Sequence, residues 1–193
     1  DRYPNDRIKW DSINKEREPD DLIWGYSDDD MHSLSGNAFR NYQHFLMNSL
    51  NESEFRNAMI KGAFYFSYEP DGTNQANPNY GEAKTPKLIN VIISGDIITI
   101  TGEEYTSIQW YNQTTSVVGT GASIDVSTLN YTKFVRAVLT NANGTTYTQP
   151  FGFQEYVPPA SYTLTVNTVG NGSITKNPTQ NSYIEGTIVQ LNA

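Results

Sequence analysis

Short β-branched segments separated by turn residues fill the chain from residue 88 to residue 155. Val, Ile and Thr recur in runs of about four to eight residues, the length and composition of strands. Two turns stand out, Ser-Gly-Asp at 94–96 and Asn143-Gly144, the strongest hairpin signal in the chain. About seven short strands at this spacing predict an antiparallel β-sandwich over residues 88–155, with Trp110 in its core.

Length and charge limit the possible partners. The chain has 193 residues and 37% hydrophobic content, so several small cores are expected rather than one large one. The formal charge of −8 argues against nucleic acid, because phosphate binding requires a basic face. No stretch approaches the roughly 20 apolar residues of a membrane helix, so no membrane span is expected. The chain begins at Asp1 and ends within an apolar alternation at 191–193, which predicts a piece of a longer protein.

The texture of the sequence predicts an α+β multidomain fragment with three structured regions. Residues 1–69 are predicted to form a partial β/α segment, and residues 70–87, rich in Pro and Gly, a linker or long loop. The β-sandwich at 88–155 is expected to be immunoglobulin-like. Tandem prolines make 156–161 a stiff linker, and 162–193 is predicted to be a small, truncated β-repeat.

The first region alternates between strand and helix patterns, as α/β layer architectures do. Asn51 and Gly62 are the predicted cap and end of its clearest helix. The predicted elements are a helix at 11–17, a short buried strand at 22–26, helices at 37–50 and 52–61, and a strand at 63–68.

An apolar run at 22–24 ends in three carboxylates and one of the two histidines. Asp30 and His32 place a hard oxygen ligand and an imidazole two residues apart, and on a strand both would point to one face, as a chelating site requires. From the residues alone, a polar turn with His32 capping the next helix is the favoured alternative. His44 is expected to be a partly exposed helix residue rather than a ligand.

The first region resembles the last part of the PHP family, named for polymerase and histidinol phosphatase domains. The resemblance covers about a third of the chain and rests on four stretches in order: Trp10-Asp11, Ile23-Trp24-Gly25, Asp29-Asp30-Met31-His32 and Gly62-Ala63-Phe64-Tyr65. It implies a distorted β/α barrel whose metal cluster hydrolyses phosphate esters.

Carried over residue by residue, the resemblance makes Asp30 and His32 metal ligands and Asp29 a second-shell or turn residue, while Asp28 has no role. The implied metal is Zn, Mn or Fe in the intact parent. The early His-x-His motif of the family is absent here, and two ligands do not make a catalytic zinc site, which needs three plus water. The fragment is therefore expected to hold no metal and to be inactive by itself, and no catalytic residue is assigned.

The last region resembles the divergent β-repeats of internalin-like bacterial surface proteins. The matching stretches are 162–166, 170–174, Pro178 and 186–191. This resemblance implies an exported bacterial parent, secreted or at the cell surface, and no catalytic residues in the repeat.

Three hypotheses for function remain. The first is a C-terminal fragment of an exported PHP-type metal-dependent phosphoesterase with accessory β-modules. The second is a non-catalytic module that binds glycan or cell wall, for which Tyr111, Tyr131 and Tyr147 could stack on sugars if they shared one face. The third is a structural spacer. Whether this piece acts as an enzyme stays open.

Overall fold

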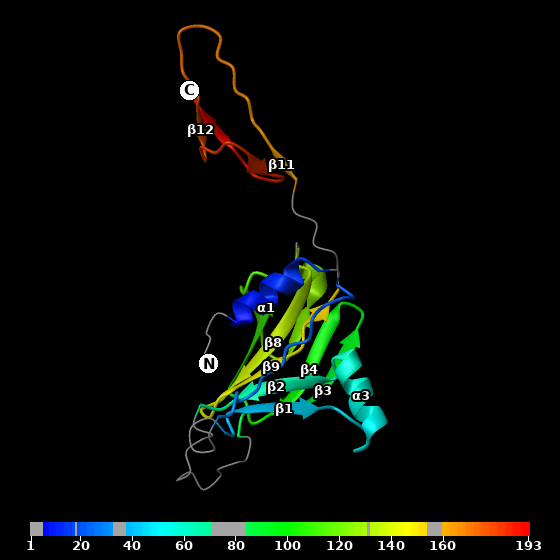
Figure 1. The fold of residues 1–193 in the computed structure, drawn as a ribbon. Helices are drawn as coiled ribbons and strands as arrows, with labels where there is room; N and C mark the ends of the chain where they lie inside the picture. Colours follow the sequence, from blue (N-terminus) through cyan, green and yellow to red (C-terminus); the bar gives the residue numbers. More distant parts are fainter. Residues whose placement is uncertain (1–5, 18, 33–37, 71–83, 131, 154–159) are drawn as a thin grey trace. The chain divides into compact units, whose positions relative to one another are not determined.

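The computed structural model divides into two compact units, Asp1–Tyr156 and Val157–Ala193. It describes residues 6–17, 19–32, 38–70, 84–130, 132–153 and 160–193 (Figure 1). Most of the linker expected at 70–87, and residues 156–159 of the second linker, lie outside this set. The second unit begins within the 156–161 range in which the sequence predicts a linker.

Two antiparallel sheets form the larger unit. The large sheet has the order β1-β2-β9-β8-β5-β6, with β10 paired to β8. Its strands are β1 (Asn41–Phe45), β2 (Phe64–Tyr68), β5 (Ser107–Asn112), β6 (Val117–Thr120), β8 (Phe134–Thr140), β9 (Thr145–Thr148) and β10 (Phe151–Gly152). The small sheet has the order β3-β4-β7, and its elements are β3 (Lys87–Ser94), β4 (Ile97–Glu103) and β7 (Ser123–Asp125), followed by the 3-10 turn η1 (Val126–Thr128).

The core lies between the facing sides of these sheets. Along each strand alternate side chains point inward, so β-branched and aromatic residues from both sheets meet. Trp110 of β5 is fully buried, and its Nε1 donates to the carbonyl of Gly121 at 2.8 Å. The buried core residues are Tyr65, Leu88, Ile98, Ile100, Ile108, Trp110, Ile124, Val126, Val135, Ala137 and Leu139. The strands predicted across 88–155 and their β-sandwich arrangement are therefore present.

The boundary between the first two predicted regions differs from the structure. Strand β2, from the first region, pairs with β1 on one side and with β9 on the other, and Tyr65 lies opposite Thr148. Residues on both sides of 70–87 thus share one sheet and one compact unit. The β/α barrel segment expected for 1–69 is not what the described residues form, because every strand pairing among them is antiparallel.

Helix α1 (Asp6–Lys15) packs on the outer face of the large sheet, away from the small sheet (Figure 1). Asp11 accepts two hydrogen bonds from the Arg136 guanidinium of β8, at 2.9 and 2.6 Å, and both side chains are at least 96% buried. Trp10 and Tyr111 place their rings 5.5 and 5.1 Å from that guanidinium. A bidentate, aromatic-flanked ion pair therefore fixes the helix to the sheet.

The C-terminal end of α1 is capped by a lysine from the sheet. Lys133 is buried, and its Nζ donates to the carbonyl of Lys15 at 3.0 Å and to the carbonyl of Arg17. The last carbonyls of a helix have no partner within the helix, and a cation there also opposes the helix dipole. The sequence predicts a helix at 11–17, and the observed helix begins five residues earlier.

Residues 22–30 cross the outer face of the large sheet beside α1, without the strand pairing predicted for 22–26. Their backbone bonds to side chains instead. The side-chain amide of Asn14 accepts a hydrogen bond from the N–H of Ile23 at 2.7 Å and donates one to the carbonyl of Ile23 at 3.1 Å. The Gln149 amide does the same for Gly25, at 2.7 and 2.9 Å. Two buried amides thus take the place of a neighbouring strand.

Helix α3 (Glu52–Lys61) matches the predicted helix at 52–61. The Asn51 side chain accepts from the N–H of Glu54 at 2.9 Å, and Gly62 ends the helix with a φ of 67°. A β-carbon at Gly62 would also lie 2.9 Å from the Trp24 ring. Both the positive φ and this close contact therefore require glycine. The helix predicted at 37–50 is wrong: residues 41–45 form the edge strand β1, whose whole length pairs with β2.

The smaller unit, from residue 157, is described in short strands: β11 (Ser161–Tyr162) pairs with β13 (Tyr183–Ile184), and β12 (Thr175–Asn177) pairs with β14 (Gln190–Asn192). Tyr183 is its buried aromatic residue, and its hydroxyl donates to the carbonyl of Pro178 at 3.0 Å. In the part of the chain described, no helix combines the length and apolarity needed to cross a membrane.

Candidate metal-binding loop

The Asp-x-His pair lies on an exposed loop at the end of the 22–30 segment. Asp30 has a φ of 44°, and its N–H donates to Oδ1 of Asp28 at 2.8 Å, an Asx turn that stabilises this left-handed backbone. His32 Nε2 lies 3.5 Å from Asp30 Oδ1, and the two side chains are 78% and 59% exposed. The carboxylate and the imidazole therefore converge, through a turn rather than through the strand that the sequence suggested.

Asp29 ties this loop to the start of β1. Its carboxylate accepts from the backbone N–H groups of Phe39, Arg40 and Asn41, at 2.6, 3.0 and 2.7 Å. The side-chain amide of Asn41 donates to it as well, at 3.1 Å. A carboxylate engaged by four N–H groups anchors the loop to the start of β1.

The geometry of the pair fits a shared ion. Two ligand atoms at zinc bonding distances in a tetrahedral site lie about 3.4 Å apart, close to the observed 3.5 Å. Among the residues that the structure describes, no group of three or more His, Asp or Glu side chains could hold a metal. A catalytic zinc centre requires three protein ligands plus water, one ligand more than this pair of side chains offers.

Aromatic contacts hold the segment that leads to the loop. The Trp24 indole donates to the carbonyl of Ile60 at 3.2 Å and covers Gly62, and Tyr26 packs on Phe64 with ring centroids 4.8 Å apart. Several large apolar side chains on this segment and on α3 remain exposed: Ile23, Tyr26, Met31, Phe55 and Ile60. Such a concentration is typical of a surface that another folded segment covers.

His44 occupies a different environment from the one predicted. It lies on β1, stacks on Tyr65 with ring centroids 4.5 Å apart, and shares a hydrogen bond of 3.0 Å with the hydroxyl of Ser67. Burial lowers the pKa of His44, and the positive charge of Lys87 lowers it further. His44 is half-buried, in line with the partial exposure predicted for it, but it lies on a strand rather than on a helix.

We expect His44 to make the larger unit less stable in mild acid. Its pKa lies below the usual value of about 6.5, so the unfolded chain takes up more protons as pH falls through that value. The free energy of unfolding should then decrease below about pH 6.5 and level off once His44 is protonated in the folded state. Urea unfolding across this range measures the effect. His44→Gln, which retains a partner for Ser67, should remove it, and an unchanged pH dependence in that variant would contradict the assignment.

Of the tyrosines considered for sugar stacking, the two that the structure describes, Tyr111 and Tyr147, do not form an exposed aromatic face. Tyr147 is buried and stacks on Phe66 at 5.2 Å, and Tyr111 lies against the Arg136 guanidinium. Tyr131 lies outside the described residues.

Two residues that sequence reasoning missed, Asn14 and Gln149, position the segment that leads to the candidate loop. No local sequence pattern marks either of them.

No family model matches the chain, and the curated proteins and the solved structures contain no match either.

Proposed function

We propose that this chain is the C-terminal part of an exported bacterial metal-dependent phosphoesterase of the PHP type. In this proposal Asp30 and His32 are two ligands of the metal centre, and the rest of the parent protein supplies the others. The convergence of the Asp30 carboxylate and the His32 imidazole at 3.5 Å on an exposed loop carries the proposal. The exposed apolar residues of the 22–31 segment and α3 support it, since the rest of the domain would cover them.

Each residue of the loop has a defined task. Asp30 supplies a hard oxygen and a negative charge, and His32 binds through Nε2 of its neutral ring. Asp28 holds the turn, and Asp29 fixes the loop to β1 through the N–H groups it accepts. A divalent ion such as Zn, Mn or Fe in this site would activate water and stabilise charge on the oxygens of a phosphate ester.

The remaining modules have accessory roles in this proposal. The strands from β3 onward in the larger unit would be an immunoglobulin-like module joined directly to the phosphoesterase segment, since β9 of the module pairs with β2 of that segment. The unit from Val157 onward would be a surface repeat, and the parent would then be secreted or at the cell surface.

The metal assignment is tested first on the chain itself. Titrating Zn²⁺ into the 193-residue protein should shift the NMR signals of the His32 ring and leave those of His44 unchanged. The affinity should be weak, because two ligands bind without a third. Asp30→Ala should reduce the His32 response. A response of His44 alone, or none at His32, contradicts the assignment.

The activity is tested in the full-length parent. His32→Ala and Asp30→Ala should each lower phosphatase activity by more than about 100-fold, the upper range for loss of an outer-sphere partner, and lower bound metal in parallel. Asp29→Asn should have a smaller effect of about 10–100-fold, because it acts through the position of the ligands. Full metal content and activity in His32→Ala would remove the proposal.

A further inference from the structure

Strand β3 is an open edge of the small sheet. It pairs with β4 on one side and, within the described residues, with no strand on the other. From Leu88 to Ser94 it carries no charge, and Ile92 and Ile93 are more than half exposed. An uncharged, apolar edge of this kind is a template for another strand. A β-bulge between Leu88 and Asn90 limits the regular edge to residues 90–94.

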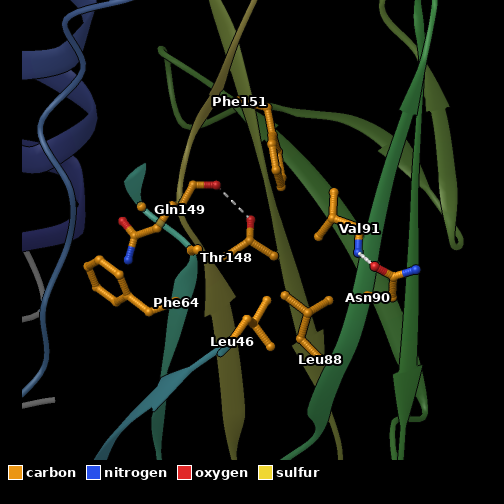
Figure 2. A pocket seen from close by; sticks show the side chains of 10 residues that line it. Leu46, Phe64, Leu88, Asn90, Val91, Thr148, Gln149 and Phe151 are labelled. Atoms are coloured by element: carbon orange, nitrogen blue, oxygen red, sulfur yellow. Dashed lines mark hydrogen bonds between the residues drawn. The ribbon is translucent and has the colours of Figure 1, made fainter. Parts of the chain in front are cut away.

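One backbone donor on this edge is only locally satisfied. In an antiparallel pair, residues bonded to the neighbouring strand alternate with residues whose N–H and carbonyl point away from it. Val91 is of the second kind, since its N–H donates to Oδ1 of the adjacent Asn90 at 2.9 Å (Figure 2). The side-chain oxygen takes the place that the carbonyl of an added strand would take.

An apolar cavity of about 260 Å³ opens beneath this edge, between the two sheets. The side chains of Leu46, Leu88, Val91 and Phe151 converge on it in Figure 2. An apolar cavity of about 150 Å³ already accommodates a benzene ring. The space beside Val91 is therefore large enough for a leucine or phenylalanine side chain.

The large sheet continues past β3 and forms a floor. Contacts of the β3 end of the small sheet reach β9 and β2: Thr146 donates to the carbonyl of Pro86 at 2.5 Å, and Tyr65 shares a hydrogen bond with the backbone of Leu88. The next strand, β1, presents His44 on the same face, stacked on Tyr65. Within the described residues β3 is the last strand of the small sheet, whereas the large sheet continues below it to β1.

The part of the large sheet below the β3 edge favours a single peptide over a second copy of the chain as the binding partner. Two copies paired through β3 about a two-fold axis would carry their large sheets on the same side. Each large sheet projects beyond β3 by its strand β1, so the two projections would occupy the same space, and both copies carry a charge of −8. A single extended peptide needs only the spacing of one strand, about 4.8 Å, and has no second layer to collide.

We propose that β3 binds an extended peptide, which adds as a fourth strand to the small sheet. Its backbone bonds to Val91 and Ile93, and one leucine- or phenylalanine-sized side chain enters the cavity beside Leu46 and Phe151. The peptide is rich in uncharged β-branched residues, as the edge itself is. Main-chain bonds supply the affinity and the pocket supplies the selectivity, as in other complexes formed by strand addition.

The probe is the capped peptide Thr-Val-Thr-Leu-Thr-Val-Thr, added to the full 193-residue chain. Hydrogen exchange should slow at the amides of Val91 and Ile93 and stay unchanged in β6, the edge strand at the other end of the large sheet. The same peptide with aspartate in place of its leucine should bind at least tenfold more weakly. Unchanged exchange in β3 at millimolar probe, or equal binding of the aspartate peptide, overturns the proposal.

Substitutions at the adjacent residues Asn90 and Val91 test the role of the Val91 N–H in peptide binding. Val91→Pro removes the edge donor and should weaken binding by up to about tenfold, the worth of one hydrogen bond. Asn90→Ala releases the same N–H from its local partner and should strengthen binding. Should Val91→Pro fail to fold, Leu46→Trp fills the cavity without touching the edge and must also weaken binding. Wild-type affinity in a folded Val91→Pro or in Leu46→Trp contradicts the site.

Discussion

Replacing Asp11 with alanine is expected to lower the free energy of unfolding of the larger unit by about 3–5 kcal/mol. The carboxylate holds the Arg136 guanidinium through two hydrogen bonds in a site where both side chains are almost completely buried. Without it, Arg136 is left as a buried charge with no counter-ion. Urea unfolding followed by tryptophan fluorescence measures the loss, and Trp10, beside Arg136, contributes to the signal.

Two controls separate the buried charge from general damage. Arg56→Ala breaks the exposed pair between Arg56 and Glu52 on α3, and it should cost no more than about 0.5 kcal/mol. Combining Asp11→Leu with Arg136→Met replaces the buried pair by apolar side chains, and it should recover most of the loss. A loss for Asp11→Ala as small as that for Arg56→Ala would show that α1 is not held by this pair.

Trp110→Ala is expected to have an effect of similar size, about 3–5 kcal/mol, for a different reason. The Trp110 side chain is fully buried between the two sheets, and a cavity remains when it is removed. Trp110→Phe keeps much of the volume but loses the bond from Nε1 to the carbonyl of Gly121, so it should cost less. Guanidinium unfolding followed by far-UV circular dichroism measures both.

The control for the core is Ile188→Ala. Ile188 is a large apolar residue that is 90% exposed in the smaller unit, and its loss should change the free energy of unfolding by less than about 0.5 kcal/mol. A larger loss in Trp110→Phe than in Trp110→Ala would contradict the view that volume dominates at this position.

Features that depend on neighbouring residues could be predicted from the sequence. The helix at 52–61 is specified by Asn51 at its start and Gly62 at its end, and the structure uses both. The β8–β9 hairpin follows from Asn143-Gly144, and the pairing of Thr140 with Thr145 shows the expected return of the chain. These signals act within a few residues, so tertiary contacts do not override them.

Features that depend on distant partners could not. Residues 37–50 carry aromatic residues at helical spacing, yet Tyr42 and His44 face one side of β1 while Gln43 faces the other. The pairing of all five residues of β1 with β2 decides the outcome, because strand propensity depends on neighbours that the local sequence does not contain. The joining of the first two regions through β2 and β9 is hidden for the same reason.

The candidate loop shows the same division. Asp30 and His32 stand out in the sequence because of their chemistry and spacing. The side chains that hold the segment before them, Asn14 and Gln149, come from α1 and from the end of β9, 9 and 124 residues away from the backbone groups they bond. Polar residues of this kind are common in any sequence, so only the fold reveals that these two are buried and engaged.

The tether between Asp11 and Arg136 spans 125 residues of chain, which sets an order of events during synthesis. At about 5–20 residues per second, roughly 6–25 s separate the appearance of the two side chains at the ribosome. Throughout that interval the amphipathic helix α1 cannot pack on the large sheet, because strand β8 has not yet been synthesised. A molecular chaperone that shields Trp10 during this delay would raise the yield of native protein, and slowing translation between the two positions would lower it.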